Sequence, residues 1–403
     1  MKSVLFFAIA ALVALWVIRR AWARWLLSRA KHPSLAGHAR WSRRFAKLVR
    51  YYAYDESVFF RADDAPAEVA ERRRAAFEGL SARCVARWPA SVAALAELEP
   101  SIPDIRFTAR YRVPFQFRDL VRRRLKTGGV FVRSEGNRLV DLDGNQSYDL
   151  GGSYGVNLFG NDFYKGCIER GAARVRDLGA VLGVYHPLMA YILPRLREIS
   201  GFDDVSFHMS GTEAVMQAVR LARYHTGRRH LVRFCGAYHG WWGDVQPGVG
   251  NPQTARDTYT LRDMHARSLR VLETRTDIAC VLVNPLQALH PNASAPADNM
   301  LVNSRRRAGF DREAYAAWLR QLRDVCTRRG IVLIFDEVFV GFRIAPGGAQ
   351  DYFGVKADLV TYGKSLGAAA FGCRAWSGLT STQAMSRRLP ITRRESSSIS
   401  FKV

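Results

Sequence analysis

Between residues 150 and 370, short apolar runs typical of buried β-strands alternate with longer segments of helical periodicity. The segments 213–224 and 315–328 repeat apolar residues at the three- and four-residue spacing of an amphipathic helix. This order predicts an α/β domain with a mainly parallel sheet covered by helices on both faces, because parallel strands need long crossover connections. The strands are expected at 205–209, 230–235, 278–283, 331–335 and 358–361.

The sequence ahead of this alternation has a different pattern. Residues 64–97 are rich in Ala, Glu and Arg and predict helix, which should end near Pro100 and Pro103. Residues 141–144, with the sequence Asp-Leu-Asp-Gly, predict a turn between two short strands. We therefore expect a helical extension and a β-hairpin before the α/β domain.

The residues Ser210-Gly-Thr-Glu213 follow a predicted strand and open a predicted helix. Ser210 is a good N-cap, and Glu213 three residues later completes a capping box. Backbone N–H groups at such a helix start, with Gly211 allowing close approach, suit a phosphate group. The same pattern is also typical of an ordinary helix start, so on its own it does not identify a ligand.

Two charged residues follow predicted strands. Asp336 comes directly after the run 331–335, at the carboxyl edge where ligands of open parallel sheets bind, and it could pair with a protonated heterocyclic nitrogen. Lys364 follows the run 358–361 in the sequence Tyr-Gly-Lys-Ser, where a pocket could lower its pKa and make it a nucleophile. Taken singly, each residue could equally be an ion-pairing carboxylate or a solvated lysine.

The fourth element is Ala237-Tyr-His-Gly240, where an aromatic ring at a strand end could stack on a planar cofactor. In this order and at these spacings, the four elements resemble the class III pyridoxal-phosphate aminotransferases, and among them most closely the glutamate-1-semialdehyde 2,1-aminomutases. The longest similar stretches are 333–367 and 210–228. The resemblance covers residues 110–370 and implies a fold-type-I domain that binds pyridoxal 5′-phosphate and works as a homodimer.

The resemblance also implies roles for individual residues. Asp336 would keep the pyridine nitrogen protonated, so that the ring acts as an electron sink. Lys364 would form the Schiff base with the cofactor and then move the substrate α-proton, which makes Asp336 and Lys364 the expected catalytic residues. Tyr238 would stack on the ring and Val338 would pack on its other face. The expected cofactor-binding residues are Ser210, Gly211, Thr212, Tyr238, His239, Asp336, Val338 and Lys364.

The implied reaction transfers an amino group to or from a carbonyl carbon, so a small-molecule amino donor and a carbonyl acceptor are the expected partners. Asn284-Pro285 stands where the family usually has Glu-Pro. This removes a carboxylate from the cofactor's surroundings and leaves the choice between aminotransferase and aminomutase open. The alternative is a non-catalytic chain that keeps the cofactor-binding fold.

After residue 367 the family continues with a glycine-rich turn, further core structure and a C-terminal small domain. Here Ala368-Ala-Ala370 begins sequence without that pattern, and residues 374–403 are rich in Ser, Thr and Arg without periodicity. We therefore expect residues 371–403 to form an irregular tail and the small domain to be missing. A truncated or frameshifted coding sequence would explain this, and divergence to a shorter protein is the alternative.

The N-terminus carries fifteen uncharged apolar residues, 4–18, after Lys2. They predict a membrane anchor over residues 1–30, with a basic, helical juxtamembrane extension over 31–109. Arg19 and Arg20 directly after the run disfavour a cleaved signal peptide, which is the alternative reading. Because positive charge is heavier after the run than before it, the body of the protein is expected in the cytoplasm.

The net charge of +24 lies largely at the two ends of the chain, since residues 1–50 contain eleven Lys and Arg and no acidic residue. No nucleic-acid-binding motif accompanies this charge, so nucleic acid is not an expected partner. The six cysteines are scattered without a Cys-x-x-Cys pair, which argues against a zinc site or a disulfide framework and fits a reducing compartment.

Overall fold

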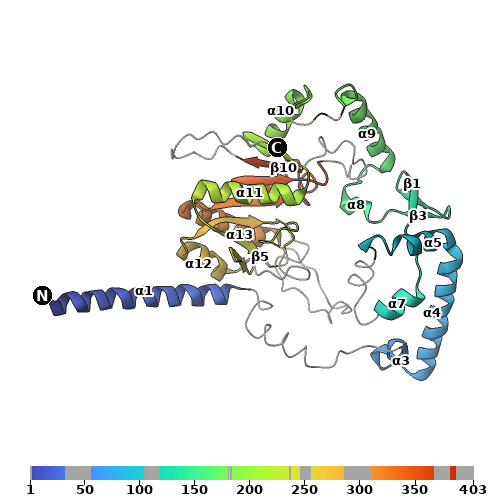
Figure 1. Cartoon of the computed structure of the whole chain (residues 1–403), viewed down its shortest axis with the longest axis horizontal. Coiled ribbons are helices and arrows are strands. Elements are labelled where there is room, and N and C mark those ends of the chain that lie inside the picture. Colours follow the sequence, from blue (N-terminus) through green and yellow to red (C-terminus); the bar gives the residue numbers. More distant parts are fainter. Residues whose placement is uncertain are drawn as a thin grey trace. The chain divides into compact units, whose positions relative to one another are not determined.

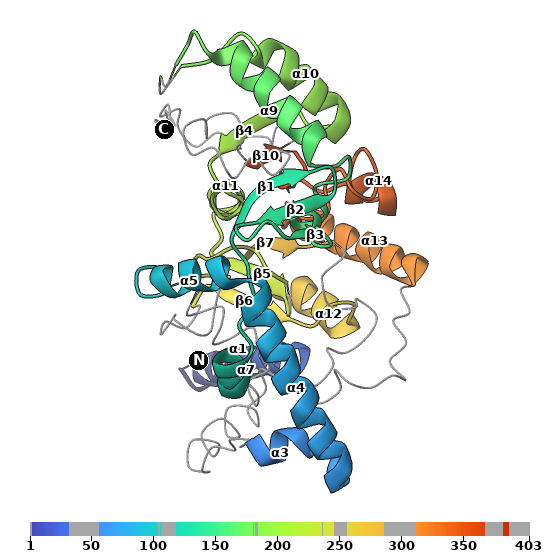
Figure 2. The ribbon, with the colours of Figure 1, turned by 90° about the vertical axis from the view of Figure 1, so that its right-hand side faces the viewer.

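The computed structural model describes residues 2–31, 56–103, 105, 118–179, 181, 184–235, 237–245, 256–285, 311–366 and 382–386. The chain divides into two compact units, one made of residues 1–41 and 172–403 and the other of residues 42–171. Figure 1 and Figure 2 show their elements coloured along the chain.

Seven strands of the larger unit, all within its described residues, form one sheet in the order β4-β10-β9-β8-β7-β5-β6. The pairs β5–β6, β5–β7, β7–β8 and β8–β9 are parallel, and β10 is antiparallel to both of its neighbours. The mainly parallel sheet expected from the sequence is thus confirmed. The strands are β4 (Asp204–His208), β5 (His230–Phe234), β6 (Thr258–Leu261), β7 (Ile278–Val283), β8 (Val332–Glu337), β9 (Leu359–Tyr362) and β10 (Thr382–Ser386).

Helices cover the sheet on two faces, because successive side chains of a strand point to opposite sides. On β7, Leu282 packs in a cluster with residues of α11 (Gly211–Thr226), while Val283 belongs to a second cluster with residues of α12 (Ala266–Thr274) and α13 (Arg312–Arg329). The strands β7 and β8 are buried along their whole length. The remaining helices of this unit are α1 (Lys2–Ala30), α10 (Met189–Ser200) and α14 (Ala349–Phe353).

The smaller unit contains a three-stranded antiparallel sheet in the order β1-β2-β3. The hairpin expected around residues 141–144 is confirmed as β2 and β3. The helix expected over 64–97 is present as two helices, because Pro89 has no N–H to continue α4 and instead starts α5. The elements are α3 (Glu56–Phe60), η2 (Ala62–Asp64), α4 (Ala67–Arg87), α5 (Pro89–Leu98), α7 (Arg118–Arg124), β1 (Phe131–Glu135), β2 (Arg138–Asp141), β3 (Gln146–Tyr148), α8 (Gly152–Gly155) and the start of α9 (Asn161–Val175).

The strands β6 and β10 were not expected from the sequence. The stretch 374–403 was predicted to be irregular, but β10 lies within it and pairs with β4 and β9. The prediction of irregular structure is therefore wrong for these five residues. Their sequence, TQAMS, has no apolar run, so only pairing with strands distant in sequence identifies it as a strand. The domain boundary expected at 30/31 comes from the N-terminal apolar run, and those at 109/110 and 370/371 come from the family resemblance; all three remain predictions.

The Arg228 side chain forms hydrogen bonds with both the start of β7 and the end of α13. Its Nη1 donates to the carbonyl oxygens of Ile278 at 3.1 Å, Arg329 at 2.9 Å and Gly330 at 3.0 Å. The last carbonyls of a helix have no partner within the helix, so a cation there is favourable through both hydrogen bonding and the helix dipole.

We expect Arg228→Met to lower the free energy of unfolding by about 1–3 kcal/mol, because three acceptors lose a charged donor. The neighbouring Arg229→Met is the matched control. Arg229 is exposed and pairs only at the surface with Asp257, at 2.6 Å, so its loss should cost less than about 1 kcal/mol. Urea denaturation of both variants measures the difference, and equal unfolding midpoints would contradict the role of Arg228.

Candidate active site

Three polar residues lie side by side at the carboxyl ends of β7, β8 and β9. Asp336 on β8 pairs in register with Thr361 on β9, and Asn284 directly follows Val283, which pairs with Phe335 just before Asp336. Side chains two residues apart in a strand share a face. The polar row of Asn284, Asp336 and Thr361 therefore continues the sheet face that packs against α11.

The Asp336 carboxylate is buried and receives three hydrogen bonds. Its Oδ2 accepts from His239 Nδ1 at 2.7 Å, and its Oδ1 accepts from Val338 N at 3.2 Å and from Thr361 Oγ1 at 3.3 Å. Asp336 and His239 are only 3% and 2% exposed. A buried carboxylate needs such donors because it has lost its hydration.

Two other buried polar atoms at this edge have no hydrogen-bond partner among the described residues, namely His239 Nε2 and Asn284 Oδ1. We assign the Nδ1 proton of His239 from its bond to the carboxylate, which leaves Nε2 turned away from Asp336. Buried polar atoms in native proteins are nearly always paired. Their occurrence beside Asp336 indicates that a polar ligand or water belongs here.

The start of α11 has the capping geometry expected from the sequence. Ser210 Oγ accepts from Glu213 N at 3.2 Å, and Glu213 Oε2 accepts from Met209 N at 2.9 Å. The backbone N–H groups of Gly211 and Thr212 lie in the first turn, where no helical carbonyl can accept from them. This end of α11 can therefore bind an anion through backbone donors.

Two glycines bring the loops of the site into close contact. A Cβ on Gly211 would lie 3.0 Å from Val338 Cγ1. A Cβ on Gly240 would lie 2.9 Å from the Cα atom of Thr212, and Gly240 also has a φ of 92° that other residues rarely adopt. The loop after β5, the start of α11 and the end of β8 thus meet in one place.

Lys364 follows β9 at the same edge of the sheet. Burial lowers the pKa of its amine from the ordinary value, while the charge of Asp336 acts to raise it and that of Arg343 to lower it further. The backbone of Lys364 has a φ of 39° although it is not glycine. Such strained conformations cost about 1–3 kcal/mol and concentrate at functional sites.

Sequence reasoning did not single out Phe339 and Arg343. Two cations lie close to the Phe339 ring, with the Arg343 guanidinium carbon 4.5 Å and the Lys364 Nζ 5.6 Å from its centroid. Arg343 Nε also donates to Ser365 Oγ at 3.0 Å. The sequence offered one signal for Arg343, because it is the single charged residue in the apolar and glycine-containing run 338–348.

The other expected residues lie at the same place in the fold. Tyr238 is 53% exposed, and its ring centroid is 6.2 Å from that of Trp241 in an edge-on arrangement. Val338 is half-buried against Gly211. The structure therefore brings together the residues proposed from the sequence, while their individual roles toward a cofactor remain predictions.

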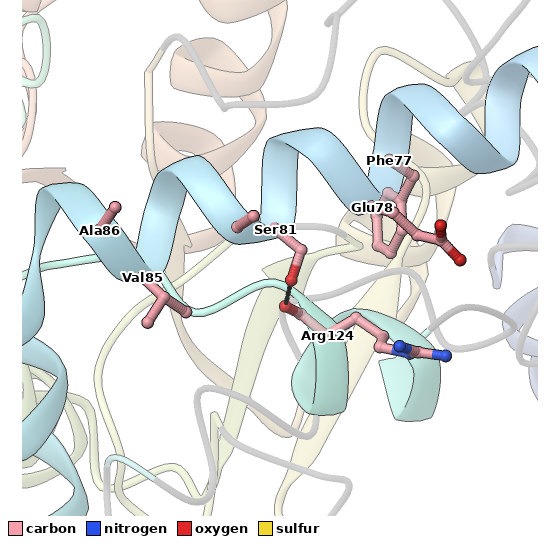
Figure 3. Close-up of a pocket in the computed structure, with 7 residues that line it drawn as sticks. Phe77, Glu78, Ser81, Val85, Ala86 and Arg124 are labelled. Atoms are coloured by element: carbon pink, nitrogen blue, oxygen red, sulfur yellow. Dashed lines mark hydrogen bonds between the residues drawn. The ribbon is translucent and has the colours of Figure 1, made fainter.

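Figure 3 shows a separate hollow, in the smaller unit, between α4 and α7. Ser81 Oγ donates to the carbonyl oxygen of Arg124 across it. Its lining is mostly apolar and contains none of the residues of the polar row. We therefore place the candidate active site at the sheet edge.

An anion-binding helix start, a buried Asp–His pair and a partly buried lysine at one edge of an α/β sheet define a site for a phosphorylated heteroaromatic compound. Residues 122–387 match the family model of the class-III aminotransferases, and this chain belongs to that family. The match continues beyond residue 370, where we expected the resemblance to end, and includes β10.

Individual relatives agree with this family. Glutamate-1-semialdehyde 2,1-aminomutase of Acetivibrio thermocellus is 34% identical over 252 residues, which cover 58% of this chain and 54% of the relative. A solved transaminase with pyridoxal phosphate bound is 28% identical with a TM-score of 0.52, over 65% of this chain and 58% of that one. This chain thus spans about half the length of the curated relatives it matches.

A solved glutamate-1-semialdehyde aminomutase from Pseudomonas aeruginosa PAO1 shares the fold, with a TM-score of 0.57 at 20% identity over 78% of this chain and 64% of that one. With the family match, this confirms the fold-type-I architecture expected from the sequence.

Glu337, next to Asp336, points to the opposite face of the sheet and is fully buried. Its Oε2 accepts from Ala349 N at 2.7 Å. Burial raises the pKa of this carboxyl to about 8, against which the backbone donors of Ala349 and Gln350 act. Glu337 is therefore protonated in the folded protein at neutral pH.

This shift predicts a pH dependence of stability. The folded pKa of about 8 lies above the unfolded value, so between these values the folded state holds a proton that the unfolded chain has released. The free energy of unfolding should fall by on the order of 1 kcal/mol per pH unit across this window, and level off above it. In Glu337→Gln the urea midpoint should change less between about pH 5 and about pH 9 than in the wild type.

The control for this prediction is Glu273→Gln, which removes an exposed carboxylate paired with Arg328 at 3.3 Å. This variant should keep the pH dependence of the wild type. Identical pH profiles for wild type and Glu337→Gln would contradict the assignment.

Proposed function

We propose that this chain binds pyridoxal 5′-phosphate at the edge formed by β7, β8 and β9 and catalyses an amino-group transfer. The observation that carries the proposal is the buried Asp336–His239 pair beside Lys364. The unpartnered His239 Nε2 and Asn284 Oδ1 support the fit of this site to the cofactor. The N–H groups in the first turn of α11 support it as well, because they can donate to a phosphate group.

Each residue has a function that its surroundings support. Gly211 and Thr212 would hold the phosphate group through backbone N–H donors. Asp336 would hold the proton on the pyridine nitrogen, and its three donors fix the carboxylate in place. When bound, the cofactor supplies an electron sink for the substrate carbon.

Lys364 would serve as nucleophile and then as the base that moves the substrate α-proton. Both tasks need the neutral amine, and the burial that lowers the pKa of Lys364 favours that form. Arg343 would support this because its positive charge lowers the pKa of Lys364 and its hydrogen bond holds Ser365, the residue after Lys364.

The substrates we propose are a small amine and a carbonyl compound, with transfer between two molecules or within one amino-aldehyde. The relatives named as aminomutases and as a transaminase both support this reaction class. Because Asn284 is neutral, Asp336 is the single carboxylate of the polar row. A site with Glu in place of Asn284 would have two carboxylates.

We expect purified protein with added cofactor to be yellow, and Lys364→Ala to lose this absorbance, because Lys364 is the amine that we propose bonds to the cofactor aldehyde. Lys356→Ala is the control, since Lys356 is about half-exposed and pairs with Asp351 at 3.4 Å. Absorbance spectra during cofactor titration measure the effect. A wild-type spectrum that stays at that of free cofactor would refute the proposal.

The second candidate is a non-catalytic protein that binds the cofactor without turnover, in which Asn284 stands where the family usually has Glu. Mixing the yellow protein with amino donors separates the two. A change in absorbance with at least one donor supports catalysis, whereas an unchanged spectrum with bound cofactor supports the second candidate.

Asn284 provides a finer test of the site. Asn284→Ala removes a buried polar group from the row, and we expect the dissociation constant for pyridoxal 5′-phosphate to rise about 3- to 10-fold, as for one lost hydrogen bond. Gln217→Ala on α11, whose side chain meets Arg220 at 3.3 Å, is the control. An unchanged dissociation constant in Asn284→Ala would exclude Asn284 from the cofactor site.

We also propose that α1 is an uncleaved membrane anchor and that the larger unit lies on the cytoplasmic side. The supporting observation is an apolar helix near the N-terminus, residues 6–30, that is long enough to cross a membrane. The arginines that follow the apolar run favour this orientation.

A further inference from the structure

The helix α1 has two parts with different surroundings. From Ala23 onward one side of the helix is covered, with Leu26 and Ala30 buried and Ala23 and Leu27 half-buried. These positions are three and four residues apart and form a single stripe along the helix. Before Ala23, the side chains described in α1 are exposed.

The covered part of α1 is built into the larger unit. Leu26 and Ala30 belong to the main core cluster together with Leu261 of β6 and Leu272 of α12. Arg262 N donates to the Ala30 carbonyl at 3.0 Å, and Lys31 forms an antiparallel bridge with Leu261. The helix therefore ends against β6, an edge strand of the sheet, and packs directly on the larger unit.

The uncovered part of α1 is apolar around its whole circumference. Phe6, Leu12 and Ile18 are 69%, 67% and 64% exposed. A helix that is apolar on all sides is typical of a membrane environment rather than of the surface of a water-soluble protein. The apolar run of residues 4–18 would extend about 22 Å at 1.5 Å per residue, so the residues that flank it complete the crossing of a hydrocarbon core about 30 Å thick.

The residues between these two parts are those preferred at the membrane–water interface. The Arg20 guanidinium carbon lies 4.6 Å from the ring centroid of Trp16, and the rings of Trp22 and Trp25 stack at 4.9 Å. Indole rings and guanidinium groups settle at the level of the lipid headgroups. The membrane–water interface therefore lies at the part of α1 where its packing against the larger unit begins.

We infer that the larger unit stands directly on an anionic bilayer in a fixed orientation, with α12 facing the headgroups. The helix α12 packs against α1, and its exposed side carries Arg267 and Arg270, while Arg24 and Arg29 of α1 are exposed as well. Such residues are attracted to an anionic surface. The inference rests on the membrane anchoring proposed above and is independent of catalysis.

A test uses the full chain with Lys364→Ala, so that the outcome does not depend on turnover. A fluorophore is attached at Arg270→Cys on α12 or, as the matched control, at Arg320→Cys on the exposed side of α13. Exposed and half-buried native cysteines are replaced by serine. The protein is reconstituted into phosphatidylcholine–phosphatidylglycerol vesicles whose headgroups carry a nitroxide quencher.

We expect several-fold stronger quenching at position 270 than at position 320. Equal quenching at the two positions would overturn the fixed orientation. In a Leu26→Ser, Ala30→Ser variant, the protein should stay bound to vesicles while the difference between the two positions disappears. If the difference in quenching persists in this variant, the packing of Leu26 and Ala30 does not determine the orientation of the larger unit.

Vesicle flotation separates this inference from the anchoring on which it depends. If the protein floats with neither anionic nor neutral vesicles, both the membrane anchoring and the fixed orientation are refuted. If α1 instead pairs with a second copy, the protein would remain a vesicle-free oligomer that cross-links through Trp16→Cys, and this outcome would also refute the inference.

Discussion

The buried carboxylate of Asp336 is the group on which the arrangement of the site depends. It takes hydrogen bonds from three separate segments, namely the loop after β5 through His239, the end of β8 through Val338 and β9 through Thr361. Removing such partners from a buried charge is strongly destabilising. Hydrogen bonds to this one side chain therefore link the register of β8 with β9 to the position of the loop after β5.

Asp336 and its neighbour Glu337 show how a strand separates two carboxylates. Their side chains point to opposite faces, so Asp336 accepts a hydrogen bond from His239, while Glu337 accepts one from the backbone of Ala349. Burial raises the pKa of Glu337 to about 8. Two adjacent carboxyl groups therefore have different surroundings, and Asp336 is the one that lies in the polar row.

The sequence predicts these strands and the capping of Ser210 because both depend on local patterns. The run at β7 was located at its observed bounds, since six consecutive apolar residues have few other uses. In contrast, β10 and the contact of Arg343 with Ser365 depend on chain segments that meet only after folding. The orphaned atoms of His239 and Asn284 were likewise beyond sequence reasoning, because burial and hydrogen bonding are properties of the folded sheet.

The position of α1 keeps the proposed membrane anchor apart from the site. It joins the sheet at β6, an edge strand, whereas Asp336 lies on β8, with β5 and β7 in between. Three strand spacings amount to about 14 Å. The proposed anchor would therefore set the orientation of the larger unit, while the hydrogen bonds around Asp336 come from β8, β9 and the loop after β5.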